Sequence, residues 1–139
     1  LPSAFFLVAK TDEGILTPTA YSAIDEISRA GTPHLPDALL EAIRQGSADI
    51  GKALYNVFEL PLARLAPKTL GLKEKMARLS DGALLCGSGT AVFAVFDSEK
   101  RASDAAEILK KDKSVTFVSV CHPVGVGVEV SLCDSNNCP

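Results

Sequence analysis

The sequence contains no uninterrupted apolar run that approaches the roughly 20 residues of a membrane-spanning helix. Its first residues show no charged segment followed by an apolar one, so a signal peptide is not predicted. Basic residues are not in excess, since 14 Lys and Arg stand against 17 Asp and Glu, giving a net charge of −3. We therefore expect no nucleic-acid partner, no membrane partner, and a location in the bacterial cytoplasm.

The cysteines and histidines show no metal-site spacing. There is no CxxC pair, and His34 and His122 are not spaced like zinc ligands. We expect no metal site, and free thiols in a reducing compartment, although the last two cysteines could oxidise in air. The four cysteines are Cys86, Cys121, Cys133 and Cys138.

What is present is the composition of an ordinary globular protein. A chain of 139 residues suits a single domain, and 47% apolar with 22% charged residues excludes a disordered chain. Apolar runs and turn residues predict strands at 4–9, 82–86, 91–96, 115–120 and, by strict alternation, 124–132. Helical spacing predicts helices at 17–31, 35–45, from 47 or 49 to 58, from 67 to about 81, and at 98–109. The predicted fold is α+β, an antiparallel or mixed sheet of four or five strands with helices mainly on one face.

A turn of small residues, Gly87, Ser88, Gly89 and Thr90, separates two apolar strands that we expect at the centre of the sheet. Glycines let backbone N–H groups form a nest for anionic oxygens, but they also serve tight hairpins for geometric reasons alone. The turn is not a Walker loop, because no Gly-Lys-Ser/Thr follows. It is not a dinucleotide fingerprint either, because it leads to a strand and not to a helix.

The second candidate site lies where the first predicted helix begins. Thr17 is placed to cap the helix, Pro18 suits the first helical position, and Tyr21 follows one turn later on the same side. These residues read either as a cap with a core-edge aromatic or as the lining of a polar ligand pocket. No nucleophile is paired with a base, so the residues alone name no reaction.

Three segments, in this order and spacing, resemble motifs of the carboxyl-terminal domain of the GHMP kinase superfamily. Residues 14–21 (GILTPTAY) resemble its strand-to-helix element G-[IV]-x-T-x-x-[AV]-[YF], and residues 53–59 (ALYNVFE) resemble the stretch that follows. Residues 86–94 (CGSGTAVFA) are similar to the third motif, Ser-Gly-Ser-Gly-x-x-[VC]-Phe-[AG], with Cys86 in place of the usual Ser or Thr. The resemblance runs from residue 1 to about 96 and is greatest to the kinase of the non-mevalonate isoprenoid pathway.

This resemblance implies an ATP- and Mg²⁺-dependent kinase that phosphorylates an alcohol group of diphosphocytidyl methylerythritol. In the superfamily, the amino-terminal domain holds ATP in a Pro-x-x-x-Gly-x-x-Ser-Ser loop and carries the catalytic Asp and Lys. No such loop occurs in residues 1–139. We therefore expect the chain to be the substrate-binding domain only, with no catalytic residue, no bound cofactor and no activity by itself.

The motifs that match also imply site residues. Thr17, Pro18 and Tyr21 are expected to line the substrate pocket, and the turn at 87–90 is expected to lie at the junction with the ATP domain. For Asn56 a helix-cap role is favoured over a ligand contact.

Two other readings remain open: a GHMP kinase of the homoserine or mevalonate type, and a non-catalytic α+β ligand-binding or regulatory module. Leu1 is not an initiator methionine and directly precedes a predicted strand, so we expect it to lie at an internal domain boundary. An apolar face made to meet a missing amino-terminal domain would favour self-association of the chain alone.

Overall fold

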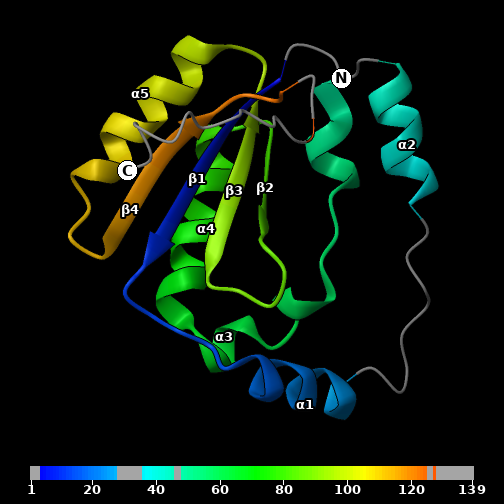
Figure 1. Cartoon of the computed structure of the whole chain (residues 1–139), viewed down its shortest axis with the longest axis vertical. Helices are drawn as coiled ribbons and strands as arrows, with labels where there is room; N and C mark the ends of the chain where they lie inside the picture. Colours follow the sequence, from blue (N-terminus) through cyan, green and yellow to red (C-terminus); the bar gives the residue numbers. More distant parts are fainter. Residues whose placement is uncertain (1–3, 28–35, 46–47, 125–126, 128–139) are drawn as a thin grey trace, which may run out of the picture.

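The computed structural model describes residues 4–27, 36–45, 48–124 and 127, and the fold within them is α+β (Figure 1). The predicted strand at 124–132 lies largely outside the described residues, as do His34, Cys133 and Cys138. The strands are β1 (Phe5–Thr11), β2 (Gly82–Leu85), β3 (Ala91–Phe96) and β4 (Val115–Cys121). The helices are α1 (Thr17–Ile27), α2 (Asp37–Arg44), α3 (Leu62–Leu65), α4 (Pro67–Leu79) and α5 (Glu99–Lys110), with short 3₁₀ helices η2 (Ala48–Ala53) and η3 (Val57–Glu59).

The described strands form one antiparallel sheet in the order β2-β3-β1-β4. Side chains alternate along each strand, so one face of the sheet carries the buried residues. On β1, for example, Leu7, Ala9 and Thr11 are fully buried while the residues between them are not. The antiparallel sheet with helices on one face confirms the predicted fold class.

Helices α4 and α5 cover that buried face, and Figure 1 shows α4 running behind the strands. Leu72 and Met76 of α4 and Leu109 of α5 enter the same apolar cluster as Leu7 and Phe96. A small-residue stripe on α5, made of alanines 102, 105 and 106, lets that helix lie close to the sheet. Helix α1 lies at the edge of this core beside α3, where Glu26 pairs with Arg64 at 3.0 Å.

The predicted helix from 47 or 49 to 58 is wrong as one element. The chain forms η2 and η3 instead, separated by Leu54–Asn56. Gly51 of η2 lies directly against Gly82 at the start of β2, so close that a Cβ on either residue would overlap the other's backbone. This contact, between residues far apart in sequence, replaces the regular helix that local spacing favours.

The hairpin is placed correctly, but only one of its strands is central. In the described sheet β3 lies between β2 and β1, while β2 forms an edge. The apolar character of β2 has a different reason: Ala83 and Leu85 are buried under α4, and η2 lies beside the strand. Covering an edge strand in this way limits pairing with other chains.

Candidate functional site

Three segments that are far apart in sequence meet at one end of the sheet. They are the loop between β1 and α1 (residues 12–16, here the β1–α1 loop), the segment 56–59 that forms η3, and the turn at 87–90 (here the glycine turn). A Cβ atom placed on Gly89 would lie only 3.3 Å from Ile15 Cδ1, so the β1–α1 loop packs directly on the glycine turn. These segments include parts of all three stretches that the sequence singled out.

The glycine turn has the backbone that its residues predict. Gly87 has φ +54° and Gly89 has φ +101°, both in the region that disfavours any side chain. The Gly89 N–H donates to the Cys86 carbonyl at 3.0 Å, which closes the turn. The N–H groups of Gly87 and Ser88 donate to no other described residue, so the turn can offer them to an anionic oxygen.

Asn56 links η3 to the glycine turn. Its side-chain oxygen accepts a hydrogen bond from the Phe58 N–H at 3.0 Å, which confirms the predicted cap role. Its amide nitrogen also donates to the carbonyls of Leu85 (2.9 Å) and Gly87 (2.8 Å), contacts that the sequence did not predict. One side chain therefore caps η3 and holds the entrance of the turn.

Glu59 binds the other backbone group of Leu85, its N–H. Its carboxylate accepts a hydrogen bond from the Leu85 N–H at 2.9 Å and pairs with Lys73 of α4 at 3.0 Å. Asn56 and Glu59 thus satisfy both backbone groups of Leu85 at the sheet edge, where no described strand is available to pair with them. The segment that carries the second sequence motif fixes the position of the third.

The residues at the start of α1 lie at the rim of this site. Thr17 is the first helical residue and not the cap, because the Leu16 carbonyl already accepts from the Ala20 N–H at 3.1 Å. Pro18 follows as the second helical residue, and the side chains of both are exposed. Tyr21 is 57% exposed and packs edge-on against Phe58, with ring centroids 5.0 Å apart. Through Phe58 and Asn56, Tyr21 is connected to the glycine turn.

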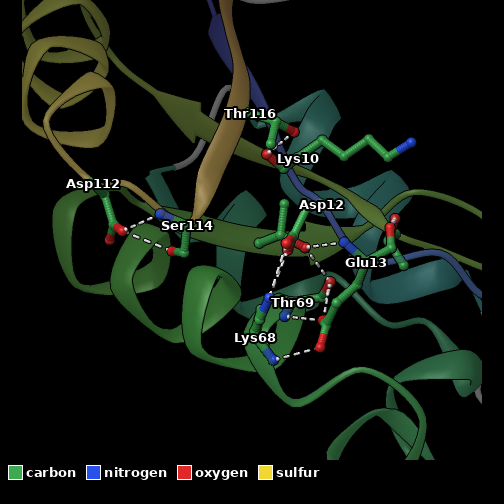
Figure 2. A network of polar contacts seen from close by, with 10 residues as sticks. Lys10, Asp12, Glu13, Lys68, Thr69, Asp112, Ser114 and Thr116 are labelled. Carbon is green, nitrogen blue, oxygen red and sulfur yellow. Dashed lines mark hydrogen bonds and ion pairs between the residues drawn. The ribbon is translucent and has the colours of Figure 1, made fainter.

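Glu13 occupies a position that sequence reasoning missed (Figure 2). Its carboxylate accepts hydrogen bonds from the N–H groups of Lys68 (3.1 Å) and Thr69 (2.7 Å), the first free donors of α4. Its own carbonyl accepts from the Thr90 hydroxyl at 2.7 Å. The missed signal is at 66–67, where α4 begins with Ala-Pro and has no local side-chain cap, so an acceptor from elsewhere is required.

The described residues contain no group of three or more His, Cys, Asp or Glu placed to hold a metal ion. Cys86 and Cys121 are free thiols, as the sequence predicted. Cys86 lies just before the glycine turn, and burial raises the pKa of its thiol, so the reactive thiolate is disfavoured there. No helix in the described part of the chain is long and apolar enough to cross a membrane.

A separate open hollow of about 350 Å³ lies between α2 and η2, lined by residues that include Leu39, Lys52 and Tyr55. None of the residues predicted as site residues lines it. Its position therefore does not coincide with the junction of the three motif segments.

Comparison with known proteins agrees with the family that the three motifs indicate. The family model described as GHMP kinases C terminal matches residues 37–114. The 4-diphosphocytidyl-2-C-methyl-D-erythritol kinase of Caldicellulosiruptor bescii is 31% identical over 127 residues, which cover 89% of this chain and 44% of that protein. The kinase of the same name from Desulfitobacterium hafniense is 32% identical over 114 residues, covering 79% of this chain and 39% of that protein. The chain thus spans less than half the length of these relatives.

Solved structures give the same picture. A crystal structure of 4-(cytidine 5'-diphospho)-2C-methyl-D-erythritol kinase superposes with a TM-score of 0.69 at 26% identity, covering 89% of this chain and 45% of that one. Homoserine kinase from Cytophaga hutchinsonii superposes with a TM-score of 0.66 at 18% identity, covering 86% of this chain and 42% of that one. The second similarity shows a shared fold alone.

Proposed function

The chain belongs to the GHMP kinase family, whose carboxyl-terminal domain it matches, and from this we propose that it is the substrate-side domain of an ATP-dependent kinase. The proposed acceptor is an alcohol group of diphosphocytidyl methylerythritol, the substrate in the names of the relatives. The observation that carries the proposal is the meeting of the three family motifs at one end of the sheet, beside an exposed aromatic side chain.

Each part of the site has a proposed role. Thr17, Pro18 and Tyr21 are exposed at the rim and line the substrate pocket, with the Tyr21 ring held by Phe58 for an apolar or stacking contact. The glycine turn lies at the junction with the ATP domain, where its unused N–H groups can face phosphate oxygens. Orientation of this kind is a large part of what an enzyme contributes to phosphoryl transfer.

We propose that an amino-terminal domain, encoded upstream of this chain, binds ATP and Mg²⁺ and carries the catalytic groups. ATP supplies the phosphoryl group, and Mg²⁺ neutralises charge on the phosphates. The chain alone is then inactive, and the complete protein acts in the cytoplasm.

The surface proposed to meet that domain is apolar. Leu16, Tyr21 and Leu60 are 77%, 57% and 55% exposed, and they lie on the β1–α1 loop, on α1 and just after η3. Exposed apolar groups of this kind favour association when their natural cover is absent. Light scattering of the isolated chain is expected to show dimers at high concentration, and a clean monomer would count against this assignment of the surface.

A substrate panel tests the proposed function. The term two-domain protein is used below for this chain joined to the proposed amino-terminal domain encoded upstream of it. With ATP and Mg²⁺ the two-domain protein is expected to phosphorylate diphosphocytidyl methylerythritol at a much higher kcat/KM than homoserine or mevalonate. A preference for homoserine would support the alternative of a homoserine-type kinase, and an upstream sequence without an ATP loop would favour a non-catalytic module.

A further inference from the structure

We propose that Glu13 is a positioning residue that sets the β1–α1 loop against the glycine turn and so aligns the two sides of the substrate site. The inference rests on the proposed function for its kinetic part. Glu13 itself is assigned no contact with substrate. It acts through the residues on either side of it in space.

The side chain of Glu13 anchors the β1–α1 loop to α4. One carboxylate oxygen accepts from the Lys68 N–H at 3.1 Å, and the other accepts from both the N–H (2.7 Å) and the hydroxyl (2.9 Å) of Thr69. A carboxylate at a helix N-terminus is favoured by the free N–H groups and by the helix dipole. The nearby pair Asp12–Lys68 is exposed and adds little, so the anchor depends on Glu13.

The backbone of Glu13 joins the same anchor to the two neighbouring segments. Its carbonyl accepts from the Thr90 hydroxyl at 2.7 Å, and Thr90 is only 4% exposed. Its N–H donates to the Thr11 hydroxyl at 3.3 Å, and that hydroxyl bonds to Thr69 at 3.0 Å. These bonds close a ring through β1, the β1–α1 loop and α4, with the glycine turn attached to it.

This arrangement couples the two halves of the site. Ile15, two residues after Glu13, packs on Gly89, and Thr17 begins α1 two residues after Ile15. If the carboxylate is removed, the β1–α1 loop loses its attachment to α4, and both Thr17 and the Thr90 contact can shift. Because these residues are proposed to bind substrate, such shifts are expected to weaken substrate binding more than they slow the chemical step.

The chain supplies a matched control at Asp112, which Figure 2 shows apart from Glu13 and which pairs with Lys75 of α4. The Asp112 carboxylate also accepts three hydrogen bonds, from the N–H (3.0 Å) and hydroxyl (2.7 Å) of Ser114 and from Lys75 (2.8 Å). Asp112→Ala therefore removes a similar polar anchor without touching the motif segments. General loss of stability should affect both variants alike.

The first experiment measures amide hydrogen exchange in the 139-residue chain and needs no enzymatic activity. Glu13→Ala is expected to speed exchange of the Gly89 N–H about tenfold relative to Asp112→Ala, because the turn loses its support while the fold remains. Equal exchange at Gly89 in the two variants would overturn the proposed coupling. This result stands whether or not the proposed kinase function is correct.

The second experiment measures kinetics in the two-domain protein with diphosphocytidyl methylerythritol. Glu13→Ala is expected to raise KM about tenfold with kcat changed less than about threefold, while Asp112→Ala leaves both near wild type. Combined with Thr90→Val, the Glu13→Ala effect on KM should be less than additive, because the two changes break one linkage. Equal KM effects in Glu13→Ala and Asp112→Ala, or full additivity with Thr90→Val, would contradict a positioning role. If the wild-type two-domain protein is inactive, the proposed function is refuted. The hydrogen-exchange experiment alone then tests whether Glu13 supports the glycine turn.

Discussion

Asn56 allows a sharp test of how the motif segments are held together, since Asp and Asn serve almost equally well as helix caps. If Asn56 were only the cap of η3, Asn56→Asp would leave stability unchanged. In the structure, however, the amide nitrogen donates to the carbonyls of Leu85 and Gly87 at 2.9 and 2.8 Å. Asp keeps the acceptor for the Phe58 N–H but places a carboxylate oxygen against two carbonyl oxygens.

The expected loss follows from these contacts. Each hydrogen bond contributes about 1 kcal/mol to stability, and the contact to Gly87 is exposed, so losing both donations costs about 1.5 kcal/mol. Repulsion between the carboxylate and the carbonyls brings the loss in Asn56→Asp to about 2–3 kcal/mol. For a chain of this size that corresponds to a fall in Tm of about 5–10 °C. Asn56→Ala, which also loses the cap, should cost about 2.5 kcal/mol.

The measurement is urea unfolding of the 139-residue chain followed by circular dichroism. Ser98→Asp is the matched control, because Ser98 caps α5 as an acceptor from the Arg101 N–H. That variant should lie within about 0.5 kcal/mol of wild type. If Asn56→Asp also leaves the free energy of unfolding unchanged, the amide of Asn56 does not hold the glycine turn, and the proposed link between η3 and the turn is wrong.

Three further predictions concern the turn, the rim and the response to acid. Gly87→Ala should reduce stability by about 1 kcal/mol, because only its φ of +54° is unfavourable for a side chain. Gly89→Ala should cost about 2–3 kcal/mol, since a Cβ there would also lie 3.3 Å from Ile15. Urea unfolding of both variants checks this order. Tyr21→Ala should change stability by less than about 1 kcal/mol, because the side chain is 57% exposed, yet raise KM of the two-domain protein about tenfold; an unchanged KM would remove Tyr21 from the site. Hydrogen bonds from Lys75 and Ser114 hold the pKa of Asp112 well below its ordinary 3.8, so their stabilisation is complete above about pH 5 and is lost as the pH falls toward the native pKa. Asp112→Asn should therefore flatten the decline in stability between about pH 5 and pH 2, and an unchanged acid profile would refute the assignment.

Much of the fold was predictable because local signals agree with it. Pro67 begins α4, Ser98 caps α5, and the small residues of the glycine turn separate β2 from β3 as expected. The segment 47–58 failed because the deciding interaction is the contact of Gly51 with Gly82, which local spacing does not contain. The edge position of β2 was missed for a similar reason: burial under a helix makes an edge strand as apolar as a central one.

The candidate site was predictable as a set of segments but not as an arrangement. Motif residues identified Thr17, Tyr21 and the glycine turn, yet the groups that bring them together are Glu13 and the amide of Asn56. The hydrogen-bond partners of Glu13 lie 55 and 56 residues further along the chain, and those of the Asn56 amide lie 29 and 31 residues further along. A polar side chain with such distant partners looks in the sequence like any solvated loop residue.

The central claim is that this chain supplies the substrate side of a kinase whose chemistry lies in another domain. The most direct measurement is transfer of labelled γ-phosphate from ATP to diphosphocytidyl methylerythritol, by the 139-residue chain and by the two-domain protein under the same conditions. The account predicts turnover by the two-domain protein and none above background by the 139-residue chain. Turnover by the chain alone, or none by the two-domain protein, would contradict it.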